Sequence, residues 1–251
     1  YAANTLGSRV LQFQVGADFL SNLLSSRYVS REYGGAQIDA LIRVGVLERF
    51  EVGFPIYYRS TRLLGGNPRN EPPANSFSYG INLRGNVLQS NGKTPNIGMM
   101  AEVRLPDANA ERYAEGISQT FLLMIEQPLE ERIRLSSNIG MVRHSVANFV
   151  YTLNLSVDVS PKATIFVEHY GSYFRDYNDL YSEDKAYDFW YGKVNAGFSF
   201  ALTNDLQSDV QGGWGSLAVT EFNNTNTDWY VGMGLSYRVR FKKREPKNPK
   251  S

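Results

Sequence analysis

The chain is dominated by segments in which every second residue is large and apolar. The clearest is "WYVGMGLSYRVRF", from Trp229 to Phe241, where the apolar residues alternate with a tyrosine, two glycines, a serine and two arginines. Because successive side chains of a strand point to opposite faces, this period of two predicts a strand with one apolar and one polar face.

The same alternation recurs along the whole chain and predicts about twelve strands. Their typical length of roughly ten residues is what a tilted strand needs to cross a bilayer. The predicted strands cover residues 11–19, 38–46, 50–58, 77–87, 97–105, 120–126, 133–141, 149–159, 165–170, 190–200, 206–214 and 229–241.

The connections between these segments alternate in length. The long ones are residues 20–35, 59–76, 106–118, 175–188 and 217–228, with the shorter 143–148 in a long-loop place, and the short ones are 47–49, 88–95, 127–131, 160–162 and 203–205. Long outer loops, tight periplasmic turns and an even strand count are typical of bacterial outer-membrane barrels. A soluble β-sandwich is the alternative, but it has no reason to separate loop lengths in this way or to repeat an apolar stripe on every strand.

We therefore predict an all-β fold, a transmembrane antiparallel up-and-down β-barrel of about 12 strands with both termini periplasmic. The barrel domain is predicted over residues 1–241, and the basic stretch 242–251 is predicted to be a disordered periplasmic tail. In a barrel the apolar positions meet the lipid bilayer and, in the outer leaflet, lipopolysaccharide. The predicted lipid-facing residues are Phe13, Val15, Ile42, Val52, Phe54, Ile81, Leu83, Val103, Leu123, Leu153, Leu155, Phe198, Val231, Met233, Leu235 and Phe241.

The alternate positions are predicted to line the lumen. They are Asp18, Asp39, Arg43, Glu51, Arg84, Glu102, Arg104, Glu126, Arg134, Asp158, Glu168, Tyr170, Tyr191, Lys193, Asp209, Tyr230, Arg238 and Arg240. A lining of one sign would indicate an ion-selective pore, whereas these charges nearly balance. A balanced lining favours ion pairs that brace or partly block a narrow interior. Further lumen aromatics, Tyr57 and Phe166, join the tyrosines as side chains that either stack on a planar solute or fill space.

Composition excludes several other classes. The formal net charge is +1, so the basic excess expected of a nucleic-acid partner is missing. The chain has no cysteine, which rules out disulfides, thiolate metal sites and a cysteine nucleophile. No apolar run reaches the length of a transmembrane helix. Because no signal peptide is visible, residue 1 is expected to begin a mature chain whose signal has been removed, in the bacterial outer membrane.

Candidate chemical sites are weak, so we predict no enzyme, no catalytic residue, no cofactor and no metal. His144 beside Ser145 gives a poor match to the nucleophile and base of a lipid hydrolase, because a triad also needs an orienting third group. The acidic loop around Asp176, Asn178, Asp179, Glu183 and Asp184 lacks the spacing and the glycine of a calcium loop.

Two stretches resemble an outer-membrane family first named for the meta-pathway of phenol degradation. In "IDALIRVGVLERFEVGFPIYY" the matching positions are Gly45, Leu47, Glu48, Arg49 and Glu51, and "FSFALTNDLQSDVQGGWG" with "DWYVGMGLSYRVRF" is similar to that family's closing strands. The resemblance runs from about residue 11 to residue 241. It implies a small outer-membrane barrel that passes hydrophobic or aromatic compounds, and it brings no catalytic residues with it.

Three hypotheses follow from these observations. The first is a passive outer-membrane channel or uptake barrel for small molecules, including hydrophobic or aromatic ones. The second is a structural or accessory barrel within a larger outer-membrane protein complex. The balanced lumen charge favours it, because such a charge balance indicates a braced interior. The third is a lipid-acting hydrolase, which rests on His144 and Ser145 alone.

Overall fold

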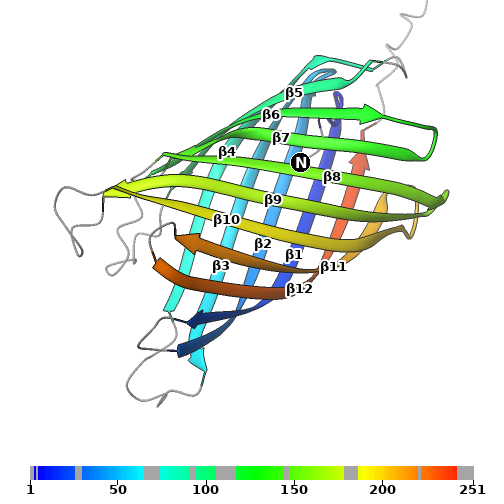
Figure 1. The fold of residues 1–251 in the computed structure, drawn as a ribbon. Coiled ribbons are helices and arrows are strands. Elements are labelled where there is room, and N and C mark those ends of the chain that lie inside the picture. Colours follow the sequence, from blue (N-terminus) through cyan, green and yellow to red (C-terminus); the bar gives the residue numbers. More distant parts are fainter. Residues whose placement is uncertain are drawn as a thin grey trace, which may run out of the picture.

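A computed structural model gives the fold of the chain as a closed β-barrel (Figure 1). It describes residues 3, 5–25, 30–64, 74–90, 94–105, 117–143, 147–177, 186–219 and 222–241. No helix in this described part is long and apolar enough to cross a membrane.

Twelve strands make up the barrel, and each pairs antiparallel with its neighbours in sequence. The ring is closed by β12 pairing with β1, with Val10 opposite Arg240 and Ser21 opposite Trp229. The strands are β1 (Val10–Ser25), β2 (Ser30–Leu47), β3 (Phe50–Leu64), β4 (Ala74–Leu88), β5 (Asn96–Leu105), β6 (Ser118–Pro128), β7 (Ile133–Arg143), β8 (Ala147–Ser160), β9 (Ala163–Tyr177), β10 (Ala186–Ala201), β11 (Leu206–Val219) and β12 (Phe222–Arg240).

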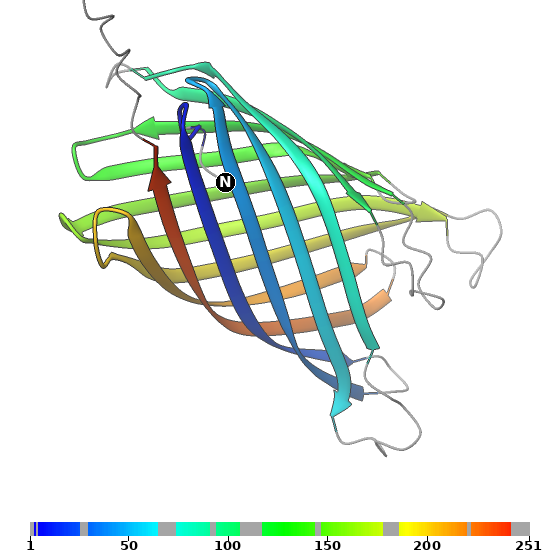
Figure 2. The same cartoon turned by 180° about the vertical axis from the view of Figure 1, so that it is seen from behind.

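The predicted strand number, order and direction are confirmed. Closure pairs every strand with a neighbour on both sides and leaves no free sheet edge, which is the condition for spanning hydrocarbon. In Figures 1 and 2 the strands β6–β10 of one wall cross the strands β1–β4 of the other at a steep angle, as strong strand tilt requires.

Several strands are longer than predicted. The predicted loops 20–35 and 217–228 are largely strand, because β1 runs on to Ser25, β2 begins at Ser30, and β12 begins at Phe222, 19 residues long. The pattern did not reveal these extensions, since segments such as "FNNTNT" have no apolar stripe. Strand pairing there continues the register of the ladders.

The outer surface is apolar. Of the predicted lipid-facing residues, 14 are exposed, among them Val15 at 46% and Met233 at 58%, and only Ile42 and Val52 are half-buried. A water-soluble protein rarely leaves so continuous an apolar surface uncovered, whereas a barrel in lipid requires it.

Candidate functional site: the barrel lumen

Polar side chains of non-adjacent strands meet each other, which places them on the concave inner face. Tyr57 on β3 donates a hydrogen bond to Glu102 on β5, with 3.4 Å between the oxygens. Tyr191 on β10 donates to Asp228 on β12 at 2.7 Å. Because only the inside of a barrel brings such positions together, the residues in register with them are inner residues as well.

A charged cluster of Arg43, Glu51 and Arg84 joins β2, β3 and β4 close to the β2–β3 turn. The Arg43 guanidinium donates from Nε and Nη2 to the two oxygens of Glu51 at 2.8 and 2.9 Å, and Arg84 Nη1 lies 3.5 Å from the same carboxylate. The Glu51 side chain is fully buried. A buried carboxylate shared by two guanidiniums is satisfied only in a fixed geometry, so this cluster braces one end of the lumen.

The segment preceding β1, residues 3 and 5–9, lies against this cluster and is here called the inner segment. The amide of Leu6 donates to Glu51 Oε2 at 2.9 Å, and Asn86 Nδ2 donates to the Ala3 carbonyl oxygen at 3.2 Å. Gly45 permits the approach, because a Cβ there would lie 1.6 Å from the Gly7 carbonyl oxygen. This inner segment occupies part of the lumen. The hydrophobic pattern of the sequence did not predict its position, because its contacts are to residues about 40 or more positions away.

A second polar group sits on β3, β4 and β5. The Arg104 guanidinium carbon lies 3.7 Å from the centre of the Tyr57 ring, and its Nη2 is 3.1 Å from Glu102 Oε1. Asn82 Nδ2 donates to the other oxygen of Glu102 at 3.4 Å. Tyr57, predicted either to stack on a solute or to fill space, is thus held by a cation–π contact and a carboxylate.

A tyrosine–lysine group, formed by Tyr170, Tyr191, Lys193 and Tyr230, occupies β9, β10 and β12. Lys193 Nζ lies 3.4 Å from the centre of the Tyr230 ring, and the Tyr170 and Tyr191 rings meet edge to face at 5.9 Å. Nearby, Asn195 Nδ2 donates to Glu168 at 3.1 Å. These predicted lumen residues are brought together from two paired strands, β9 and β10, and from β12.

A lumen cavity of about 270 Å³ lies against β1, β2, β3, β11 and β12. Its border includes the carboxylates of Asp39 and Asp209 together with Pro55 and Tyr57. Asp39 accepts hydrogen bonds from Gln37 at 2.9 and 3.1 Å. The nearly balanced charge of the sequence therefore does not mean uniform ion pairing, because Asp39 has an amide partner while Arg43, Arg84 and Arg104 gather on β2, β4 and β5.

One inner region is apolar, which sequence reasoning missed. Met100, Leu122, Met124 and Val150, here called the apolar wall, are buried on β5, β6 and β8, with Val142 and Tyr170 packed against them. Ala3 of the inner segment covers part of it. Arg84 Nη2 lies 3.7 Å from Met100 Sδ, which places this wall on the same inner face as the charged cluster. The available signal was the loss of alternation in "MMA" and "FLLMI", where both faces are apolar.

Asp18 lies in the middle of β1, opposite Gly232 and Gln37, whereas the predicted lumen residues on β6, β7, β8 and the end of β12 lie near the turns. Arg134 makes two bonds of 2.8 Å to Asp158, which also accepts from Thr164. Glu126 is half-buried, and its Oε1 accepts a hydrogen bond from Asn96 Nδ2 at 3.5 Å. Arg238 and Arg240 are exposed, and Arg240 lies 3.3 Å from Asp205. These residues therefore border the turn end of the barrel, and they take no part in the central lumen.

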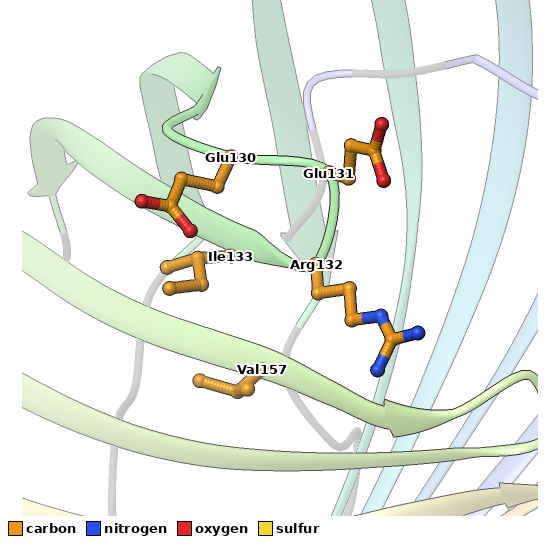
Figure 3. Close-up of a pocket in the computed structure, with 5 residues that line it drawn as sticks. All are labelled: Glu130, Glu131, Arg132, Ile133 and Val157. Atoms are coloured by element: carbon orange, nitrogen blue, oxygen red, sulfur yellow. The ribbon is translucent and has the colours of Figure 1, made fainter.

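An open hollow lies outside the lumen at the β6–β7 turn (Figure 3). It is bordered by Glu130, Glu131, Arg132, Ile133 and Val157. The side chains of Glu131 and Arg132 point away from Glu130 and Ile133, so the hollow does not enclose a ligand site.

Other predicted features fall outside the described residues. These are His144 and Ser145, the acidic residues Asp179, Glu183 and Asp184, and the tail 242–251. Within the described part of the chain, no group of three histidine, cysteine or acidic side chains is placed to hold a metal ion.

A family model described as "Putative MetA-pathway of phenol degradation" matches residues 4–239. The chain belongs to this family, as the two stretches quoted above suggested. None of the curated proteins matches it in sequence.

Solved structures of outer-membrane barrels share the fold at low identity. An outer-membrane channel from Pseudomonas putida F1 aligns with a TM-score of 0.68 and 9% identity, covering 94% of this chain and 98% of that one. The KdgM porin, in complex with disordered oligogalacturonate, gives a TM-score of 0.54 at 11% identity, covering 88% and 98%. The CymD monoaromatic hydrocarbon channel gives 0.54 at 8% identity, covering 95% and 90%. These likenesses establish the outer-membrane barrel fold.

Proposed function

We propose that this chain is a passive channel of the bacterial outer membrane that admits small apolar or aromatic molecules. The observation that carries the proposal is the lumen itself, a cavity of about 270 Å³ bordered by Tyr57 and, elsewhere on the inner face, an apolar wall. A cavity of about 150 Å³ is enough to hold benzene, so the lumen cavity has room for one aromatic ring. The family membership and the fold shared with a monoaromatic hydrocarbon channel support the same class of solute.

The proposal needs no catalysis, and it gives the barrel a defined orientation. The short turns lie at the end where the chain enters β1 and leaves β12, since the Phe241 amide donates to Arg9 and the Arg238 amide to Asp205. In an outer-membrane barrel this end faces the periplasm, after a signal peptide has been removed, while lipopolysaccharide surrounds the opposite end.

The test combines two measurements on the wild-type chain. Ion conductance in planar bilayers reports whether a water path crosses the lumen. Uptake of radiolabelled toluene by Gram-negative cells reports passage of an apolar solute, because the lipopolysaccharide leaflet is a barrier that plain phospholipid does not provide. Uptake no faster than in cells lacking the chain would end the proposal.

A second candidate is an accessory barrel in a larger outer-membrane complex. The charged cluster and the inner segment favour it, since both fill the turn end of the lumen. Extraction in mild detergent would then yield a partner in fixed ratio, together with a barrel that conducts no ions. A conducting barrel that purifies alone would remove this candidate.

A further inference from the structure

Four glycines lie at consecutive levels of the inner face of β11 and β12. The cross-strand pairs at these levels are Asp209 with Gly234, Gln211 with Gly232, Gly213 with Tyr230, and Gly215 with Asp228. Each pair contains one glycine, which leaves space on the inner wall at that level. Because successive inward positions of a strand are two residues apart, the levels are spaced by roughly 7 Å.

A side-chain oxygen fills the space above each glycine. At every level this oxygen lies too close to the glycine for a Cβ to fit, so its position requires the glycine. From the turn end towards the long-loop end, the oxygens belong to Asp209, Asp18, Asn195 and Asp228, here called the oxygen row. The row begins at the lumen cavity, whose border includes Asp209 and Gly234.

The oxygen row is short of hydrogen-bond donors and of cations. Asn195 is only 6% exposed, yet its Oδ1 has no hydrogen-bond partner among the described residues, and the same holds for Oδ1 of Asp228. Asp18 accepts a hydrogen bond from Gln211, and neither Asp18 nor Asp209 forms an ion pair in the described part of the chain. A buried acceptor without a donor is costly, so these oxygens favour a cation or a donor that the solute supplies.

One cation of the chain itself lies beside the row. The Lys193 ammonium is 3.4 Å from the centre of the Tyr230 ring, and Tyr230 and Asn195 both face Gly213. The carboxylates that attract this ammonium are those of Asp228, Asp18 and Glu168. The row therefore accommodates a positive charge at this level, and the flexible stem of a lysine lets its ammonium move aside.

The lumen is divided by charge, although its charges nearly balance in number. Arg43 and Arg84 are held by Glu51. Arg104 is held by Glu102. The carboxylates of the oxygen row lie on β1, β11 and β12 instead, away from these arginines in the strand order. A lining of one sign selects ions of the opposite sign, and closely spaced sites let an ion leave one level for the next.

We propose that the oxygen row is a path for small monovalent cations along one wall of the lumen, which makes the barrel cation-selective. A cation such as potassium moves between Asp209 and Asp228 by way of Asp18 and Asn195, and it displaces the Lys193 ammonium as it passes. This path is a second activity beside the proposed passage of apolar solutes, and it does not depend on it.

The test measures the reversal potential of the wild-type barrel in planar bilayers under a gradient of potassium chloride, which gives the permeability ratio of potassium to chloride. Asp18→Asn and Asp209→Asn each remove one charge of the row and keep the size of the side chain. The matched control is Asp205→Asn, because Asp205 lies in the exposed β10–β11 turn. Folding of each variant is verified by its urea midpoint, and toluene uptake by cells is recorded beside the permeability ratio.

The wild-type barrel is expected to pass potassium in preference to chloride. Asp18→Asn and Asp209→Asn should each lower the permeability ratio about fivefold, the factor given by one elementary charge about 4 Å from the ion in water, and the control should leave it unchanged. An ion-tight wild-type barrel, or an unchanged ratio in the Asp18→Asn/Asp209→Asn double variant, would overturn the cation path and leave the proposed function intact. Selective conductance without toluene uptake would support the path and end the proposed function.

Lys193→Met tests the row in the opposite direction and covers the case in which the asparagine variants do not fold. It removes the ammonium that competes for the row and keeps an unbranched side chain beside Tyr230. The permeability ratio and the single-channel conductance are both expected to rise. Arg238→Met, which removes a positive charge from the exposed turn end, is the control and should change neither. An unchanged or lower ratio in Lys193→Met would contradict the path.

Discussion

The inner faces of β2–β4 and of β5–β8 differ sharply, although the outer faces of the two regions are alike. On β2–β4 the inward positions carry Arg43, Glu51 and Arg84, joined in a buried charged cluster. On β5–β8 the corresponding positions form the apolar wall around Leu122 and Met124. The difference shows that the surrounding hydrocarbon requires apolar side chains on the outer face of each strand only. The side chains of the inner face can therefore be charged in one region and apolar in another.

The two regions are also held together in different ways. The charged cluster depends on directed bonds to one carboxylate. Removing that carboxylate therefore leaves both guanidiniums without their shared charged partner. The apolar wall depends on contact area, which is lost in proportion to the atoms removed. Four tests, each with its own substitution or pair of substitutions, probe this contrast from the largest expected effect to the smallest.

The largest effect is expected for Glu51→Ala in the charged cluster. It leaves two guanidiniums buried without their carboxylate, and the free energy of unfolding should fall by about 3–5 kcal/mol. Urea unfolding in lipid vesicles measures the change. Asp205→Ala, which removes the exposed partner of Arg240, is the control and should cost less than about 1 kcal/mol. Equal unfolding midpoints for the two variants would show that the cluster is not a brace.

Met124→Ala tests the apolar wall. Met124 is fully buried, so truncation should lower the free energy of unfolding by roughly 2–5 kcal/mol, depending on how far the wall relaxes. Because no charge is involved, raising the salt concentration should leave the loss unchanged, in contrast to an ionic site. A loss below 1 kcal/mol, on the scale of a surface substitution, would place Met124 against open lumen water instead.

Val15→Arg and Gln14→Arg compare the two faces at adjacent positions of β1. Val15 is exposed on the outer face, where an arginine should cost about 2–4 kcal/mol near the bilayer midplane. Gln14 is half-buried on the inner face with Gln12, so the Gln14→Arg variant should unfold at nearly the wild-type urea concentration while altering ion conductance. A reversed order of stabilities would mean that the inner and outer faces had been exchanged.

Apart from the near-neutral variant Gln14→Arg and the controls, the smallest effect on stability is expected for Tyr57→Ala. It removes the cation–π contact with Arg104, worth about 0.5–1 kcal/mol, and a ring that borders the lumen cavity. Single-channel conductance should rise because the lumen widens at this level. Tyr57→Phe keeps the ring and is the matched control, and equal conductance in both variants would show that the hydroxyl, rather than the ring, sets the width.

Sequence patterns predicted most of the fold and part of the site. The alternation in segments such as Trp229–Phe241 predicted strand number and direction, and it led us to propose an inner or outer face for the side chains of each strand. It failed at strand ends such as 222–228, where both faces are polar and no stripe is visible. It also failed on the apolar wall, because a period of two identifies a face only when the two faces differ.

Within the lumen, individual inward positions were predictable but their partners were not. Arg43 and Glu51 are eight residues apart and Tyr57 and Glu102 are 45 apart, so their contacts depend on the register of the ladders and on the tilt of the strands. The bonds from the inner segment to Glu51 depend on the chain turning back into the barrel before β1 begins.

By itself, the sequence determined that this chain forms an up-and-down barrel in lipid, because the side-chain period of a strand and the thickness of a bilayer leave few other arrangements for its twelve apolar stripes. Only the tertiary structure decided which inward side chains meet and where a cavity remains. Those features depend on closure, which sets every register at once and brings together residues that no local pattern connects.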